Sequence, residues 1–254
     1  MAKKLIIGNW KMNPQSQKEA VILFKGIDEA MKSIKNTEVV ICAPFPFIST
    51  LKQLKKKKIA LGAQNTYFEQ KGAFTGEVSL YMLRDLGVTY VIVGHSERRS
   101  MGETDEMINK KVIACLKAKL TPILCVGEST RTNDASYLNI VKNQLTSCIE
   151  GVQKSQMKNI VIAYEPVWAL SSTLDRHDAT PHDFEEMKIY IKKVLSDMSS
   201  QTIASGVRIM YGGSANKDNA ESFLRAGADG LLPGKASLDV KNFSKIVEIA
   251  SKIK

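Results

Sequence analysis

The sequence predicts a closed (β/α)8 barrel that forms a single domain over residues 1–254. Short β-rich apolar runs recur eight times, and the segments between them carry helical periodicity. Uninterrupted alternation of this kind implies parallel strands joined by right-handed crossovers, and about 250 residues suit eight such units. An open doubly wound sheet is the structural alternative. It more often has a Gly-rich dinucleotide turn after the first strand, and Gly8-Asn9-Trp10-Lys11 is not that turn.

The expected strands follow in order along the chain: Leu5–Asn9, Glu38–Ala43, Ile59–Ala63, Tyr90–Gly94, Pro122–Val126, Ile160–Tyr164, Val207–Tyr211 and Gly230–Leu232. Expected helices include Gln17–Met31, Asp105–Lys119, Tyr137–Val152, Asp183–Met198 and Asn216–Ala226. Thr104 before Asp105 and Thr180 before Pro181 are helix start signals, and Gly227 is a stop signal. No linker, low-complexity tract or change in composition indicates a second domain.

Composition excludes several classes of protein. Hydrophobic residues make up 44% of the chain, which allows a large core. No apolar run approaches the roughly 20 residues that a membrane span needs, and the N-terminus lacks the pattern of a signal peptide. No membrane partner is therefore expected. The four cysteines are scattered, with no CxxC or Cys/His spacing, so no metal site is expected. A reduced, cytoplasmic location fits best.

The formal net charge of +10 is open to several explanations: nucleic acid, an anionic surface or an acidic substrate. Much of the excess is lysine in helix-like segments, for example Lys55–Lys58, with no interleaved aromatic residues of the kind a single-strand binder needs. A solvated basic surface is therefore favoured and no nucleic-acid partner is expected. A weak attraction for a small dianion is compatible with it.

One stretch, Ile160–Ala169, ends a predicted strand in Glu165 and Pro166. Proline cannot continue the ladder, so Glu165 lies where a rigid strand gives way to a loop. Taken alone, this pattern favours a solvated glutamate in a turn. The other strand ends change that interpretation.

Function in a barrel gathers at the carboxyl ends of the strands. Reading off those ends gives Asn9, Lys11, His95, Glu97, Glu128, Glu165, the turn Gly212–Ser214 and the turn Gly234–Lys235. Each has a simple structural explanation: a surface charge for Lys11, a core histidine for His95, tight turns for the glycines. Their common position at one end of their strands instead predicts a single site.

The residue types at this rim indicate a reaction class. Glycine turns after strands seven and eight let backbone N–H groups approach an anion, and Lys11 adds positive charge, so a small phosphorylated substrate is expected. Glu165 is the candidate general base, and His95 is the candidate group that polarises a carbonyl or moves protons. No nucleophile is evidently paired with a base, and no side chains have metal spacing. Proton abstraction beside a carbonyl, with no cofactor and no metal, is the simplest chemistry.

Four motifs carry a family resemblance: Gly8–Asn13, Gly94–Arg99, Ala163–Ala169 and Tyr211–Ser214. In order and spacing, from Lys4 to the C-terminal helix, they resemble the signatures of the triosephosphate isomerase family. The resemblance implies a TIM barrel that interconverts dihydroxyacetone phosphate and glyceraldehyde 3-phosphate through an enediol(ate), in glycolysis and gluconeogenesis.

The resemblance also implies roles for individual residues. Glu165 would take the carbon-bound proton and return it to the neighbouring carbon, while His95 would polarise the carbonyl and shuttle protons between the oxygens. Lys11 would stabilise the enediolate and the phosphate, Asn9 would orient Lys11 and bind His95 or substrate, and Glu97 would contact Lys11. Cys125 resembles the family's cysteine behind the base; simple core filling explains it equally well.

The segment of residues 64–77 is long for a loop in a barrel and carries aromatic residues. It is similar to the family's interdigitating dimer loop, in which Thr75 reaches the Asn9 and Lys11 region of the other subunit. The resemblance therefore implies a homodimer.

Two segments depart from the family pattern. In the lid, residues 169–181, both usual glycines are replaced, by Ser171 and Thr173, and the loop is longer. Ser171 can still offer a backbone N–H to phosphate, and the lid is expected to close through Pro166–Trp168 with a different C-terminal hinge. The turn after strand eight reads Pro233-Gly234-Lys235, with the Lys235 side chain expected to face solvent.

The expected substrate-binding set is therefore Asn9, Lys11, Ser171, Ser214, Gly234 and Lys235. Two other functions stay open at this point. Another phosphate-binding barrel, such as a sugar-phosphate epimerase, would not explain Lys11 and His95 together with the segment after Glu165. A basic binding protein that kept the barrel but lost turnover is supported by the altered lid alone.

Overall fold

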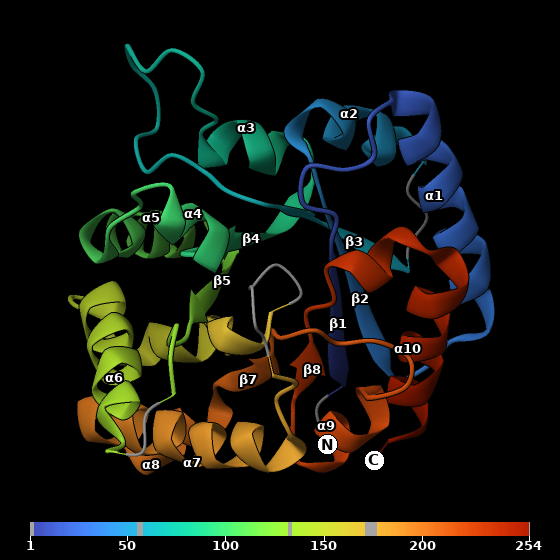
Figure 1. Cartoon of the computed structure of the whole chain (residues 1–254). Coiled ribbons are helices and arrows are strands. Elements are labelled where there is room, and N and C mark those ends of the chain that lie inside the picture. Colours follow the sequence, from blue (N-terminus) through green and yellow to red (C-terminus); the bar gives the residue numbers. More distant parts are fainter. Residues whose placement is uncertain (1–2, 55–57, 132–133, 171–176, 254) are drawn as a thin grey trace.

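The computed structural model describes residues 3–54, 58–131, 134–170 and 177–253. Within them, eight parallel strands close into a barrel in chain order, each paired with the next and the last paired with the first (Figure 1). The strands are β1 (Lys4–Asn9), β2 (Thr37–Ala43), β3 (Ile59–Ala63), β4 (Val88–Val93), β5 (Thr121–Val126), β6 (Val161–Tyr164), β7 (Arg208–Tyr211) and β8 (Gly230–Leu231). The predicted closed barrel, a single domain, is confirmed.

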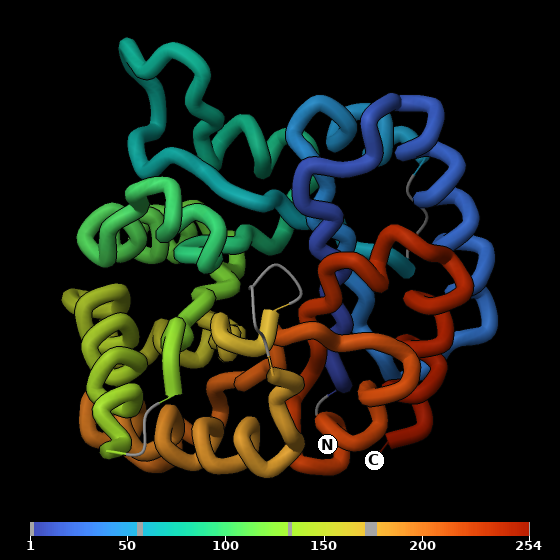
Figure 2. Tube along the Cα trace, in the orientation of Figure 1, coloured from blue at the N-terminus to red at the C-terminus, as the bar shows by residue number. Residues whose placement is uncertain are grey.

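Helices surround the strands as an outer layer, and the trace in Figure 2 follows one continuous ring in which the last helix lies against the first. The helices are α1 (Gln17–Ala30), α2 (Phe45–Leu54), α3 (Leu80–Asp85), α4 (Ser96–Ser100), α5 (Asp105–Lys117), α6 (Ser136–Ile149), α7 (Pro181–Met198), α8 (Gln201–Gly206), α9 (Ala220–Arg225) and α10 (Val240–Lys252). Short 3-10 turns are η1 (Met31–Ser33), η2 (Lys154–Asn159), η3 (Val167–Ala169) and η4 (Lys235–Leu238).

Several predicted boundaries were wrong by a residue or two at strand ends. Gly94 was expected in a strand, but it has a φ of +70° and leaves the ladder after β4. Ile160, Val207 and Leu232 also lie just outside their strands. These residues are buried like their neighbours, so hydrophobicity alone does not mark where the ladder stops.

The predicted helix starts at Thr104 and Thr180 are confirmed, because both side chains cap the helices that follow. The start of α9 was predicted wrongly at Asn216. The Asn216 side chain accepts the N–H groups of Asp218 (2.8 Å) and Asn219 (3.2 Å), which holds a turn and delays the helix to Ala220.

Three predicted helix ends were too late, and a fourth extended one residue past α9. Helix α5 ends at Lys117 because Lys119 takes a left-handed φ of +59°. Helix α1 ends at Ala30, where η1 takes over, and α6 ends at Ile149 rather than Val152. Gly227, with a φ of +92°, follows α9 as its predicted stop signal.

The core has two compartments, because each strand is buried on both faces. In β1, Leu5 and Ile7 face the interior of the barrel, whereas Ile6 packs in the layer between strands and helices. This double burial explains why the strand sequences read as continuous apolar runs.

A polar group lies at the N-terminal end of the barrel. Arg208 donates from Nη1 to Glu38 Oε2 (2.9 Å) and from Nη2 to the Tyr90 hydroxyl (3.1 Å), and Tyr90 donates to Glu38. Burial raises the pKa of Tyr90. The three side chains come from β2, β4 and β7, so they link strands that are not neighbours in the barrel.

The barrel closes at its shortest strand. Strand β8 pairs with β1 through Leu5 with Gly230 and Ile6 with Leu231, and with β7 through Tyr211 with Leu231. Four backbone hydrogen bonds flank these pairs, two to β1 from Asp229 and Pro233 and two to β7 from Asp229 and Leu232. A Cβ at Gly230 would lie 1.9 Å from the Leu5 carbonyl oxygen, so the closure needs a glycine there. Among the described residues, no helix is long and apolar enough to cross a membrane.

Candidate active site

The end of β1 holds Lys11 in a fixed but unusual backbone conformation. Lys11 has a φ of +52°, a region that residues with a Cβ seldom adopt. Its N–H donates to Asn9 Oδ1 (3.0 Å), and its carbonyl accepts from Gln64 Nε2 (2.8 Å). Asn9 and Gln64 therefore position the lysine backbone from two directions, and the Lys11 amine points to Glu97, with Nζ 2.5 Å from Oε1.

The end of β4 places an imidazole at the start of α4. His95 caps this helix: its Nδ1 accepts the N–H of Glu97 at 3.2 Å. A backbone N–H can only donate, so the Nδ1 lone pair must face it and the ring proton lies on Nε2. The helix thus fixes which ring nitrogen His95 presents to the barrel mouth.

The end of β6 carries Glu165, which is 2% exposed. Its Oε2 accepts the backbone N–H of Ser96 at 2.9 Å, and its Oε1 lies 3.2 Å from His95 Nε2 without the alignment of a hydrogen bond. Two glycines make room for this residue. A Cβ at Gly212 would lie 2.9 Å from Glu165 Cγ, and a Cβ at Gly127 would lie 1.7 Å from the Glu165 carbonyl oxygen.

Cys125 is fully buried in the barrel interior and interacts with Glu165. Burial, and then the carboxylate of Glu165, raise the pKa of the Cys125 thiol well above its ordinary value. A thiol kept protonated beside the carboxylate acts as packing and as a weak donor.

A hollow of about 340 Å³ opens beside these groups. Its lining comes from the ends of β1, β4, β7 and β8, from the segments that follow β6, β7 and β8, and from the first turn of α10: Asn9, Lys11, His95, Leu170, Gly212, Gly213, Ser214, Ala215, Asn216, Leu232, Gly234, Lys235, Ala236, Asp239 and Asn242. A Cβ at Gly234 would lie 3.0 Å from Lys11 Cε, so this glycine lets the turn after β8 approach the lysine. The space suits a molecule of a few carbons bearing an anionic group.

The structure brings most predicted site residues together. Asn9, Lys11, His95, Ser214, Gly234 and Lys235 line the hollow, and Lys11, Glu97, His95 and Glu165 form a continuous series of contacts. Glu165 lies behind His95 and does not itself line the hollow. The side chain of Lys235 is exposed at the rim. Ser171 and Thr173 lie outside the described residues.

Sequence reasoning assigned no role to Glu128 and overlooked Arg131, although both follow β5. Glu128 is buried and accepts hydrogen bonds from the Tyr164 hydroxyl (2.7 Å) and Trp168 Nε1 (2.8 Å). Burial raises the pKa of Glu128. Arg131 lies 5.8 Å from the Trp168 ring and donates from Nη1 to Asp183 at 2.9 Å. These contacts hold the segment that follows Glu165 in place. In the sequence, the only signal of this role was the position of both residues after β5.

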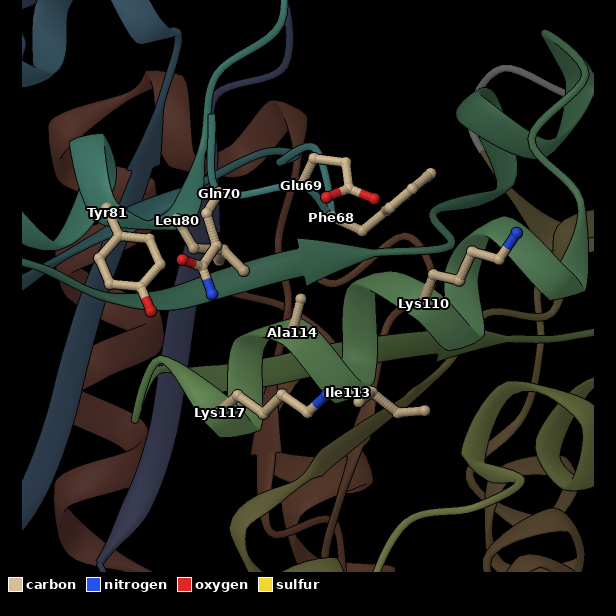
Figure 3. Close-up of a pocket in the computed structure, with 9 residues that line it drawn as sticks. All are labelled: Phe68, Glu69, Gln70, Leu80, Tyr81, Lys110, Ile113, Ala114 and Lys117. Atoms are coloured by element: carbon tan, nitrogen blue, oxygen red, sulfur yellow. The ribbon is translucent and has the colours of Figure 1, made fainter. Parts of the chain in front are cut away.

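A second hollow, of about 300 Å³, lies outside the barrel mouth. Figure 3 shows Phe68, Glu69 and Gln70 of the 64–77 loop facing α5, with Tyr81 of α3 beside them. The Lys110 amine lies 5.5 Å from the Phe68 ring centroid. This contact places the base of the loop against its own barrel, and none of the candidate catalytic side chains lines the hollow.

Across the described residues, no group of three or more His, Cys, Asp or Glu side chains is arranged to hold a metal ion. A closed parallel barrel with a carboxylate, an imidazole and an ammonium group at one mouth, beside glycine turns, defines a (β/α)8-barrel enzyme of the kind that acts on small molecules.

Comparison with known proteins identifies the family within this class. A family model described as triosephosphate isomerase matches residues 4–250. The chain is 42% identical over 252 residues to the triosephosphate isomerase of Carboxydothermus hydrogenoformans, covering 98% of this chain and 99% of that protein. It is 43% identical over 251 residues to that of a Roseiflexus species, covering 97% of each chain. The chain belongs to the triosephosphate isomerase family, and it is an isomerase of the aldose–ketose type.

Proposed function

We propose that this chain interconverts dihydroxyacetone phosphate and glyceraldehyde 3-phosphate through an enediolate, with Glu165 as the base. The observation that carries the proposal is the series of contacts from Glu165 through His95 and Glu97 to Lys11, beside a hollow with glycine turns. A proton transfer beside a carbonyl requires a base, a proton donor and a cation, and here the three are linked by contacts beside one small cavity.

Glu165 has one oxygen on the Ser96 N–H and the other near His95. To remove a carbon-bound proton, this carboxylate releases the Ser96 N–H and contacts the substrate carbon instead. Its low exposure supports the role, because little bulk water can compete with the substrate for this carboxylate.

His95 presents a proton on Nε2, since Nδ1 accepts the N–H of Glu97. In this tautomer the imidazole donates to a substrate carbonyl oxygen and then passes protons between the two neighbouring oxygens. Lys11 supplies positive charge to the enediolate and the phosphate, and Asn9 keeps the lysine backbone in place.

The phosphate is proposed to bind where the glycine turns line the hollow, at Ser214, Gly234 and Lys235, together with Ser171 of the lid. The lid, residues 169–181, is proposed to close on its N-terminal hinge. The hydrogen bond from Trp168 to Glu128 supports this hinge, because it anchors the segment directly after Glu165.

We further propose a homodimer built on the 64–77 loop, with residues 1–254 acting as one domain in each subunit. The loop projects from the barrel in Figure 1. Phe74 within it is 40% exposed, and Met82 is 57% exposed in α3, the helix whose Tyr81 lines a hollow together with the loop. Large exposed apolar side chains in one region are typical of an interface. The expected setting is glycolysis and gluconeogenesis in the cytoplasm.

Coupled turnover of glyceraldehyde 3-phosphate tests the proposal. Glu165→Asp withdraws the carboxylate by one methylene, about 1 Å or more, and a displacement of that size lowers kcat by about 100-fold with little change in KM. Glu185→Asp on the exposed face of α7 is the matched control and keeps wild-type rates. Wild-type turnover at background, or equal rates for the two variants, would refute the assignment.

A further inference from the structure

Over the residues that the structure describes, positive charge is in excess at the end of the barrel opposite the active site. Among the described residues, the segments that lead from helices into strands carry seven lysines and two carboxylates. The lysines are Lys3, Lys32, Lys35, Lys58, Lys119, Lys154 and Lys158, and the carboxylates are Glu150 and Asp229. All seven lysines are exposed. We call this end of the barrel the basic end.

The segments that leave the strands, around the active site, have the opposite balance. Their described residues include seven basic side chains, Lys11, Lys71, Arg98, Arg99, Arg131, Lys217 and Lys235. They include ten acidic side chains, Glu69, Glu77, Glu97, Glu103, Glu128, Asp134, Glu165, Asp178, Asp218 and Asp239. Attraction of an anionic substrate to the mouth therefore does not explain the net charge.

The lysines at the basic end are mostly not neutralised by carboxylates. Lys58 donates to the carbonyl of Met31 (3.0 Å) and to the carbonyl of Lys32. Such contacts satisfy carbonyl groups near helix ends and leave the positive charge in place. In the described part of the chain, Lys32 pairs with Glu29, and no carboxylate lies within 4.0 Å of the amines of the other six lysines.

One hollow at the basic end has the chemistry of a phosphate site. Lys3, Lys35 and Lys58 line it together with Thr37, whose Oγ1 is buried and has no hydrogen-bond partner among the described residues. Glu38 also lines it, but Arg208 and Tyr90 already engage that carboxylate. The ammonium groups of the three lysines can bind the oxygens of a phosphate.

We propose that the basic end docks the protein on an anionic phospholipid surface, with a headgroup phosphate in the hollow of Lys3, Lys35, Lys58 and Thr37. The lysines come from the segments that lead into β1, β2, β3, β5 and β6, so they are spread over much of this end of the barrel and a planar surface can meet them together, whereas a groove or stripe would suit a nucleic-acid strand. All seven basic side chains are lysines. Proteins that recognise nucleic acids favour arginine, which binds phosphates and bases through two parallel hydrogen bonds, so the composition also favours a lipid surface.

Two features define the mode of attachment. None of the large hydrophobic side chains that are exposed among the described residues lies in the segments of the basic end, so the protein adsorbs without insertion. Each lysine near an anionic bilayer contributes about 1 kcal/mol, which salt weakens. Because the active site opens at the other end of the barrel, the bound enzyme keeps its mouth toward solvent.

Vesicle co-sedimentation tests the proposal with the full chain. The probes are vesicles of phosphatidylcholine alone and of phosphatidylcholine with phosphatidylserine in equal parts. Wild type is expected to bind only the anionic vesicles and to dissociate as salt rises. Lys35→Glu, Lys154→Glu and Lys158→Glu combined reverse three charges at the basic end, and the partition coefficient should fall by more than about 100-fold.

The matched control is the triple variant Lys18→Glu, Lys142→Glu and Lys241→Glu, which changes the net charge equally on exposed helix positions nearer the mouth. It should bind the vesicles at least about tenfold more tightly than the basic-end variant. Equal loss in both variants, equal binding to neutral vesicles, or binding to a DNA duplex but not to anionic vesicles would overturn the proposal. Sedimentation does not depend on turnover, so an inactive protein that binds vesicles still supports it.

Discussion

Gly212 gives the sharpest test of how the barrel positions its base. A Cβ at this position would lie 2.9 Å from Glu165 Cγ and 3.1 Å from the Tyr164 carbonyl oxygen, which already accepts the Gly212 N–H. Ordinary contacts to a Cβ begin near 3.4 Å. The Tyr164 oxygen is part of the backbone, so Gly212→Ala must displace the Glu165 side chain by roughly 0.5–1 Å.

A shift of that size in a catalytic group lowers kcat by about 10- to 100-fold. Overpacking costs about 1–3 kcal/mol of stability, which lowers the Tm by about 2–4 °C per kcal/mol. Gly206→Ala is the control, because its new Cβ would meet only Lys158 Cβ at 3.9 Å. Coupled turnover and calorimetry separate the two effects. A folded Gly212→Ala protein with kcat within twofold of wild type would refute the argument that glycine here makes room for the base.

Three further predictions follow from the site. The pKa of Glu128 is raised by burial, so its contribution to stability is full below the unfolded pKa of about 4.3 and is lost as pH rises through the folded pKa. Glu128→Gln should remove that slope from urea-unfolding midpoints measured from about pH 4 to 7; an unchanged slope contradicts this. Lys235→Gln should raise KM a few-fold at low salt and less at high salt if the amine attracts phosphate, and a salt-independent effect would exclude attraction. Burial raises the pKa of all four cysteine thiols, Cys125 included, so iodoacetamide should label none in the folded protein and four after denaturation.

The barrel itself was predictable because its strands are buried on both faces and its helices on one. That contrast appears directly as apolar runs and helical periodicity. Boundaries were less predictable where one residue decides the backbone. The positive φ of Gly94 ends the strand before it, and that of Lys119 ends the helix before it. The Asn216 side chain accepts backbone hydrogen bonds within a turn, which delays the next helix. Neither effect changes the hydrophobic pattern.

The candidate site was predictable to the extent that it depends on strand ends. The residues after β1, β4, β6, β7 and β8 were expected at one rim, and they lie there. The contact of Glu165 with the Ser96 N–H and the hydrogen bonds of Glu128 could not be read from spacing, because they depend on how neighbouring loops pack. The position of the net charge was likewise hidden, since only the topology assigns each lysine to one end of the barrel.

The short seam at β8 has a consequence for motion. Even with the four backbone hydrogen bonds that flank it, this seam has fewer paired residues than the six-residue register between β1 and β2, so it is expected to open at lower free energy. Amide exchange should therefore start around Leu231, next to the turn of Gly234. This weakly paired seam borders the turn where the phosphate is proposed to bind. A bound ligand is therefore expected to stabilise the seam and to slow amide exchange there.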